Sequence, residues 1–144
     1  MGDPLAEPSS DAKHVLVVND TEEIIELFRD IVEGLGLRIS ATTFAPEDLA
    51  TVKKIGPDLV IMDLLIGGET VGWQLLQKMK MSRETDAIPV IVCTAALDSV
   101  REQEGWLTSK GVKIVLKPFN VDDIELAITK ALALPEILGG GASA

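Results

Sequence analysis

Four short segments of the chain are apolar at nearly every position, and each ends at a polar residue or a turn. They are residues 15–18, 59–62, 90–93 and 112–116. Continuous apolar runs of this length, rather than alternating ones, are typical of parallel β-strands covered on both faces. A less regular segment, residues 37–42, supplies a fifth expected strand.

Between these segments the apolar residues recur at three- and four-residue steps, which predicts amphipathic helices. One stripe runs through Ile24, Phe28 and Ile31 and has acidic residues on its other side. Thr21 could cap this helix, and Gly34 or Gly36 could end it. Further helices are expected at residues 49–55 and 97–110, along the stripe Gly72, Leu75, Leu76 and Met79, and along the stripe Val121, Ile124, Ile128 and Ala131, which Asn120 could cap.

A strand followed by a helix, repeated five times, predicts an α/β fold with a doubly wound five-stranded parallel sheet. In such folds ligands bind beyond the carboxyl ends of the strands, where the strand order reverses. The residues that end the expected strands should therefore meet at one edge of the sheet. They are Asn19, Asp20, Asp63, Thr94 and Lys117.

This group of side chains indicates phosphoryl chemistry. Asp20 and Asp63 should repel each other at short range, so the pair favours a bound cation, and hard oxygen ligands suit Mg²⁺. Lys117 and Thr94 could hold a phosphoryl group, and a carboxylate placed there could itself be the nucleophile. Each residue alone has a simpler explanation, since an aspartate after a strand is usually a turn former or a cap. Their occurrence together favours the site.

The composition of the chain excludes several classes of protein and of binding site. The chain has 144 residues, 47% of them hydrophobic, with 13 Lys and Arg against 23 Asp and Glu, a net charge of −10. These values suit one domain with a full core and argue against nucleic acid or an anionic membrane as the main partner. One cysteine, Cys93, and one histidine exclude a disulfide framework and a His-rich metal site. With no targeting or membrane-spanning segment, we expect a cytoplasmic protein with a flexible leader at residues 1–12 and a flexible tail at residues 134–144.

Four motifs at the expected strand ends resemble those of a response-regulator receiver domain, the phospho-acceptor module of two-component signalling, over residues 13–133. They are Val17-Val18-Asn19-Asp20, Pro57-Asp58-Leu59-Val60-Ile61-Met62-Asp63, Val92-Cys93-Thr94-Ala95-Ala96 and Leu116-Lys117-Pro118-Phe119. The resemblance implies a flavodoxin-like (βα)5 fold with Asp63 as the phosphoacceptor. It makes Asp20 and the backbone carbonyl of Leu65 ligands of Mg²⁺. Thr94 would be the switch and Lys117 the partner of the phosphate, with a cis peptide bond before Pro118.

The resemblance also implies a function in a bacterial phosphorelay. The domain would accept a phosphoryl group from a histidine kinase or a histidine phosphotransfer protein, and it would not be an enzyme. Its output would be a conformational change, read by a protein target at the last two helices and the fifth strand. Two copies could also pair as a homodimer.

The chain departs from the receiver pattern at several positions. Asn19 stands where the family usually has an acid, so we expect it in the outer shell of a more weakly bound Mg²⁺. The loop after Asp63 is one residue longer, with Gly67 in place of a common proline and two adjacent glycines that should make it mobile. Ile114 replaces a common aromatic residue of the fifth strand. Leu65 and Ala96 cannot orient an attacking water, which predicts slow self-dephosphorylation.

Two other interpretations stay open from the sequence. Asn19, Ile114 and the altered loop are compatible with a receiver-like interaction module that works without phosphorylation. A nucleotide- or flavin-binding domain on the same fold is disfavoured, because the chain has no glycine-rich phosphate loop after the first strand. Its 3% aromatic content, with no tyrosine, also makes a flavin-stacking pair hard to assemble.

Overall fold

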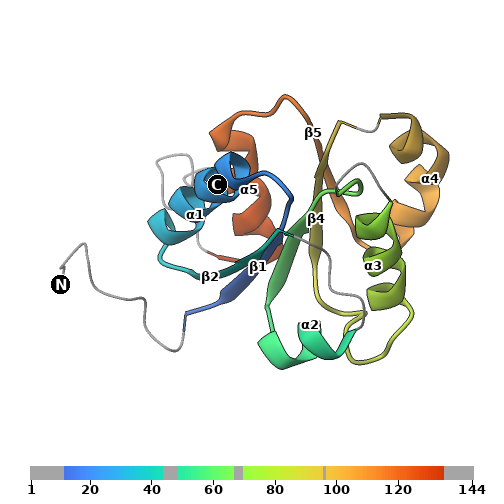
Figure 1. Ribbon diagram of the computed structural model, residues 1–144, viewed down its shortest axis with the longest axis horizontal. Helices are drawn as coiled ribbons and strands as arrows, with labels where there is room; N and C mark the ends of the chain where they lie inside the picture. The colour runs from blue at the N-terminus through green and yellow to red at the C-terminus, as the bar shows by residue number, and fades with distance from the viewer. Residues whose placement is uncertain (1–11, 44–48, 67–69, 96, 135–144) are drawn as a thin grey trace.

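The computed structural model describes residues 12–43, 49–66, 70–95 and 97–134, in which strands and helices alternate (Figure 1). The strands are β1 (His14–Val18), β2 (Arg38–Thr42), β3 (Leu59–Met62), β4 (Val90–Thr94) and β5 (Lys113–Leu116). The helices are α1 (Glu22–Gly34), α2 (Leu49–Ile55), α3 (Val71–Lys80), α4 (Leu97–Ser109) and α5 (Val121–Ala131). The predicted alternation is confirmed, and the strand boundaries differ from the expected ones by one residue at most.

The strands form one parallel sheet in the order β2-β1-β3-β4-β5. Helices α1 and α5 cover one face, and α2, α3 and α4 cover the other (Figure 1). This is the doubly wound arrangement that the sequence predicts. The chain passes from β1 outward to β2 and then returns to the other side of β1 at β3, so the strand order reverses between β1 and β3.

Alternate residues of each central strand enter two separate cores. In β1, Val15 and Val17 pack in the layer of α1 and α5, whereas Leu16 and Val18 pack against α2 and α3. All four are buried. Burial of both faces explains why the central strands are apolar at every position. Burying one aliphatic side chain fully stabilises the folded state by about 1.5–3 kcal/mol relative to leaving it exposed.

The two predicted helix caps have different outcomes. Asn120 caps α5, because its side-chain oxygen accepts a hydrogen bond from the backbone N–H of Asp123 at 2.8 Å. Thr21 occupies the N-cap position of α1, but its side chain makes no capping bond, so that prediction is wrong. Its hydroxyl instead donates to Oδ1 of Asp20 at 3.3 Å, and its N–H donates to Oδ1 of Asn19 at 2.9 Å. The hydroxyl and the N–H of Thr21 are thus both used in the turn after β1.

Among the described residues, helix α4 buries fewer side chains than the other long helices. Among its described side chains, Val100 and Leu107 are buried and Trp106 is half-buried. The Trp106 ring meets Trp73 of α3 edge to face, with 5.4 Å between the ring centres. This contact links the two helices on the α3 and α4 side of the sheet.

The expected leader and tail lie outside the described residues, apart from one residue of each. The carbonyl of Ala12 accepts a hydrogen bond from Nε of Arg38 at 3.1 Å, and Leu134 packs against the core beside α5. In the part of the chain that the structure describes, every helix is too short or too polar to cross a bilayer.

Candidate functional site

The backbone brings the ends of the strands to one edge of the sheet. The N–H of Asn19 donates to the carbonyl of Thr42 at 3.1 Å, and the N–H of Asp63 donates to the carbonyl of Val18 at 3.3 Å. On the other side of β3, the N–H of Lys117 donates to the carbonyl of Thr94 at 3.0 Å. These bonds continue the pairing of the strands by one residue. Asn19, Asp63 and Lys117 occupy these last paired positions at the edge of the sheet.

Asp63 follows the central strand β3 and is only 8% exposed. Its Oδ2 lies 2.8 Å from Nζ of Lys117, which forms an ion pair and a hydrogen bond with it. Its Oδ1 accepts a hydrogen bond from the backbone N–H of Leu65 at 3.2 Å. Both carboxylate oxygens are therefore held by donors, one charged and one from the backbone, and the side chain has a fixed direction at the edge of the sheet.

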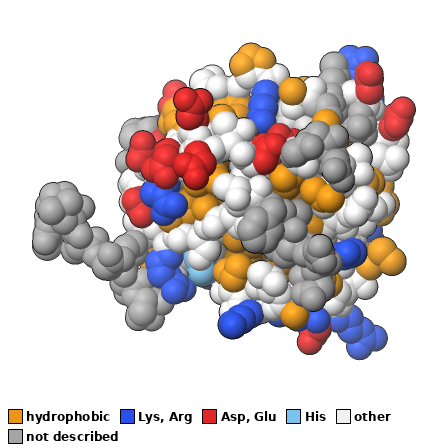
Figure 2. All heavy atoms as spheres, viewed as in Figure 1, with side chains coloured by type: hydrophobic (Ala, Val, Ile, Leu, Met, Phe, Trp, Pro, Cys, Tyr) orange, Lys and Arg blue, Asp and Glu red, His pale blue; other side chains and the backbone are white. Residues whose placement is uncertain are grey.

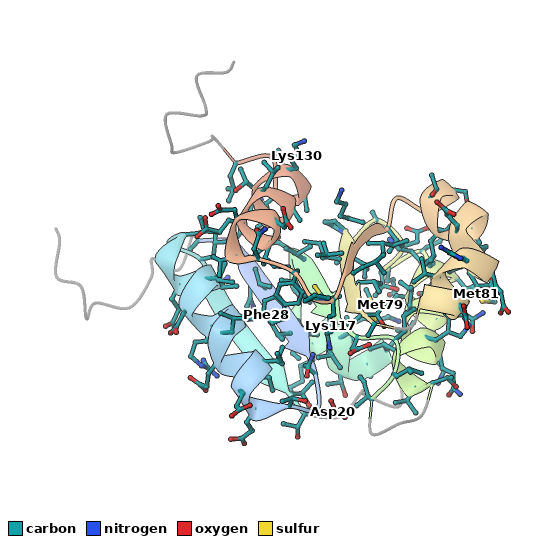
Figure 3. All side chains as sticks on the ribbon, turned by 90° about the horizontal axis from the view of Figure 1, so that it is seen from above. Asp20, Phe28, Met79, Met81, Lys117 and Lys130 are labelled. Atoms are coloured by element: carbon teal, nitrogen blue, oxygen red, sulfur yellow. The ribbon has the colours of Figure 1, made fainter. Side chains whose placement is uncertain are left out.

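Lys117 reaches this aspartate from β5, with β4 between the two strands. The peptide bond between Lys117 and Pro118 is cis, as the resemblance implied. In Figure 3 the labelled Lys117 and Asp20 both lie at the carboxyl edge of the sheet, with Phe28 in the layer beside them. An ammonium group at this place can neutralise charge on Asp63 and on a group attached to it.

Asn19 and Asp20 form the turn after β1, the strand next to β3. Asn19 is 3% exposed, and its Oδ1 accepts the N–H of Thr21. Asp20 is exposed and accepts the Thr21 hydroxyl. The amide of Asn19 thus supports the turn from inside, while the carboxylate of Asp20 faces solvent at the edge.

Thr94, the last residue of β4, is buried at 1% exposure. Its backbone carbonyl is held by Lys117, so the threonine and the lysine are joined through the main chain. Cys93 precedes it and packs in the core of α1 and α5. Burial raises the pKa of the Cys93 thiol to about 12, an effect that the charge of Lys117 opposes and the charge of Asp63 supports. A thiol with this pKa is unreactive at neutral pH, so Cys93 serves in packing.

Leu65 lies at the mouth of the site. The residue is 38% exposed and lines a pocket of about 130 Å³ between the turn after β3 and α4. The other lining residues are Leu64, Thr70, Trp73, Glu102 and Gln103. Of the expectations for this region, those for Gly67 and Ala96 lie outside the described residues.

Two carboxylates supply the negative charge of the site. Across the described ranges there is no group of three or more His, Cys, Asp or Glu side chains that could hold a metal ion. With Asn19 in place of an acid, the oxygen atoms that could hold a metal ion are those of Asp20 and Asp63, an amide oxygen and backbone carbonyls. These are hard oxygen donors of the kind that Mg²⁺ takes together with several waters.

One contact of Asp63 was not predicted from the sequence. Gly72, which appeared only as a member of an apolar stripe, lies directly on the backbone of Asp63. The signal for it was a glycine inside a helical pattern, which usually has a packing reason.

Comparisons with known proteins agree on one family. A family model described as the response regulator receiver domain matches residues 15–129. The polar-differentiation response regulator DivK of Brucella ovis is 35% identical over 83 residues, which cover 58% of this chain and 67% of DivK. The regulatory protein TcrX of Mycobacterium tuberculosis is 27% identical over 118 residues, 82% of this chain and 49% of TcrX. This chain therefore spans about half the length of TcrX.

The fold also matches solved structures. A response regulator receiver domain protein, described as CheY-like, from Methanospirillum hungatei superimposes with a TM-score of 0.73 at 23% identity. The match covers 85% of this chain and 95% of the other. It supports the flavodoxin-like arrangement of strands and helices.

Proposed function

The chain belongs to the response regulator receiver domain family, and we propose that it accepts a phosphoryl group on Asp63 in a two-component phosphorelay. The donor would be a phosphohistidine of a histidine kinase or of a histidine phosphotransfer protein. The observation that carries this proposal is the ion pair between Asp63 and Lys117 at the edge where the strand order reverses. Asp20 lies on the neighbouring strand end and adds a second carboxylate.

The proposed transfer can be written on these residues. A carboxylate oxygen of Asp63 attacks the phosphorus of the phosphohistidine, the P–N bond breaks, and the imidazole leaves and takes up a proton. The product is an acyl phosphate on Asp63. Lys117 holds the carboxylate before the attack, and its charge favours the added phosphoryl oxygens afterwards.

Mg²⁺ would be held by the carboxylates of Asp20 and Asp63 and by the backbone carbonyl of Leu65, with Asn19 reached through a bound water. When bound, it supplies positive charge against the phosphoryl oxygens. Asn19 contributes no charge, and its side-chain oxygen already accepts the N–H of Thr21. We therefore propose a weaker metal site than one with two acids after β1.

The output would pass from Asp63 through Thr94 to β5 and α5. Two grooves lie along the seam between this strand and helix, with volumes of about 280 and 330 Å³, and both include Lys113 and Lys130. Leu116 and Leu126 are large exposed apolar residues there. A protein target, or a second copy of the chain, could bind this surface.

The acidic surface of the chain indicates what kind of phosphoryl donor would bind it. The acidic residues of α1 are exposed, and Figure 2 shows acidic side chains gathered over that part of the molecule. This surface favours a partner that is basic around its phosphohistidine. For such a signalling role we propose a cytoplasmic protein that receives phosphoryl groups and is not an enzyme.

The test is phosphorylation by a small donor. We expect the protein incubated with phosphoramidate and Mg²⁺ to gain the mass of one phosphoryl group, and Asp63→Asn to gain none. Asp86→Asn, a change at an exposed aspartate outside the site, should behave like the unmodified protein. An unmodified protein that gains no mass would refute the proposal.

That negative result would favour the second candidate, an interaction module that works without phosphorylation. Two observations support it: the buried Asn19 is engaged within its own turn, and the partly buried Ile114 stands where the family commonly has an aromatic switch residue. Binding of a partner with equal affinity to the unmodified protein and to Asp63→Asn would be its signature.

A further inference from the structure

The first turn of α3 lies on the backbone that carries Asp63. A Cβ atom built on Gly72 would be 2.0 Å from the carbonyl oxygen of Asp63 and 3.0 Å from that of Leu64. Next to it, the N–H of Trp73 donates to the carbonyl of Leu64 at 3.1 Å. The helix and the turn after β3 are therefore in direct contact through their main chains.

Position 72 requires glycine because there is no room for a Cβ atom, and not because of its backbone conformation. The φ angle of Gly72 is outside the range that side chains avoid, in contrast to Gly36, Gly56 and Gly111. Contacts below 3.0 Å are essentially never made by real Cβ atoms, so an alanine would have to push the Asp63 carbonyl away by about 1 Å. No side chain can move aside to relieve this, because the opposing atoms belong to the backbone.

The backbone that would have to move also sets the geometry of the site. The N–H of Asp63 is bonded to Val18 in the sheet, and the N–H of Leu65 is bonded to the Asp63 carboxylate. A shift of the Asp63 peptide therefore turns its carboxylate relative to Lys117. It also turns the peptide of Leu65, whose carbonyl is a proposed metal ligand.

We infer that Gly72 is a positioning residue for phosphoryl transfer. By leaving room for α3 on the turn after β3, it fixes the direction of the Asp63 carboxylate and of the Leu65 carbonyl. This inference rests on the proposed function of Asp63, and it adds a residue from α3 to a site otherwise built from strand ends.

Two other helical glycines provide matched controls. A Cβ at Gly34 of α1 or at Gly105 of α4 would meet nothing within 4 Å. Alanine at either position should leave the fold intact, and in the interior of a helix it is a better helix former than glycine. Gly34→Ala and Gly105→Ala thus repeat the chemical change of Gly72→Ala without its steric effect.

The experiment measures two properties of each variant: the affinity for Mg²⁺ by calorimetry, and the rate of phosphorylation by phosphoramidate at saturating Mg²⁺. We expect Gly72→Ala to lose about 10- to 100-fold in rate, since a displacement of about 1 Å has effects of this size, and to bind Mg²⁺ more weakly. The two control variants should stay within about twofold of the unmodified protein, because their sites are unchanged.

A loss of stability alone must be separated from a loss of geometry. Val52→Ala removes buried atoms from α2, whose residues are not among those of the site, and provides a destabilised control. If Val52→Ala is destabilised in urea as much as Gly72→Ala but keeps the normal rate and Mg²⁺ affinity, the effect of Gly72 is positional. If both variants lose rate in proportion to stability, the inference is wrong.

A measurement on the unmodified protein covers the case in which Gly72→Ala does not fold. The amide of Trp73 should be protected from hydrogen exchange by its bond to Leu64, and its NMR signal should shift on addition of Mg²⁺. Fast exchange and an unmoved signal would overturn the inference. Normal phosphorylation and Mg²⁺ binding by Gly72→Ala would overturn it too but leave the proposed function intact, whereas an unmodified protein that is never phosphorylated would refute that function.

Discussion

Nζ of Lys117 lies 2.8 Å from Oδ2 of Asp63, although the two residues follow strands that are separated by β4. The lysine side chain must therefore extend across the end of β4, over Thr94, to reach the aspartate. The aspartate side chain is 12% exposed and the lysine side chain 28%, so the pair is only partly hydrated. Its contribution to stability should be larger than that of an ion pair on the open surface.

The first prediction concerns this pair. Lys117→Met should lower the free energy of unfolding by about 1–3 kcal/mol, because it leaves a buried carboxylate without its cation. Urea denaturation measures the change. Lys113→Met, at the exposed first residue of β5, should change stability by less than about 0.5 kcal/mol. In the double variant with Asp63→Asn most of the loss should disappear, and a double variant as unstable as Lys117→Met would contradict the pairing.

The pattern of apolar runs predicted the fold well, because in a parallel sheet burial on both faces leaves a direct trace in the sequence. Residues 59–62 form a strand with the predicted ends. The helix ends were harder to predict. Asn120 caps a helix as its residue type suggests, whereas Thr21 is drawn into the turn with Asn19 and Asp20. Where a side chain has two possible local partners, the tertiary geometry determines which hydrogen bond forms.

The candidate site residues were predicted from one rule, that ligands bind beyond the carboxyl ends of parallel strands. The structure brings Asp63 and Lys117 together as that rule implies. The close contact of Gly72 with the Asp63 backbone could not be predicted, because it depends on how closely α3 approaches the turn after β3. Distances between elements of this kind are set by packing and are not encoded in the local pattern.

The second prediction concerns the missing acid. Asn19→Asp should raise the affinity for Mg²⁺ about tenfold, because the charge of the ligands tunes the binding of such cations. Without the metal it should lower stability by about 1–3 kcal/mol, since Asn19 is buried and the new charge lies near two carboxylates. Calorimetry and urea denaturation with and without Mg²⁺ measure both effects. Asn120→Asp makes the same change at an exposed cap and should alter neither, and an unchanged Mg²⁺ affinity in Asn19→Asp would exclude position 19 from the metal site.

The third prediction concerns the lifetime of the acyl phosphate. The exposed side chain of Leu65 is apolar, follows Asp63 closely in the chain and cannot orient an attacking water. Leu65→Asn should therefore speed the loss of the phosphoryl group by about tenfold or more, within the range of a positioned polar group. Intact mass followed over time after removal of the donor gives the rate. Leu126→Asn, which changes a similarly exposed leucine on α5, serves as the control. Rapid decay in the unmodified protein would show that Leu65 does not limit the reaction.

The last prediction follows from Cys93. Its thiol has an ordinary pKa of 9.0, and burial raises the pKa to about 12 in the folded protein. Between pH 9 and pH 12 the unfolded chain has lost this proton and the folded chain keeps it. The free energy of unfolding should therefore fall by about 1.4 kcal/mol per pH unit through this group.

Lys80 opposes this trend, because burial lowers the pKa of its ammonium group, whose protons are donated to the carbonyls of Asp86 and Ile88. Between the lowered pKa of Lys80 in the folded protein and its ordinary value of 10.5, the folded protein has lost this proton and the unfolded chain still keeps it. The free energy of unfolding therefore rises with pH through this group. Cys93→Ala isolates the thiol: urea denaturation between pH 8 and about pH 11 should show a shallower loss of stability in the variant than in the unmodified protein. Equal slopes for the two proteins, or fast alkylation of Cys93 in the native state at pH 9, would show that the thiol is accessible to solvent.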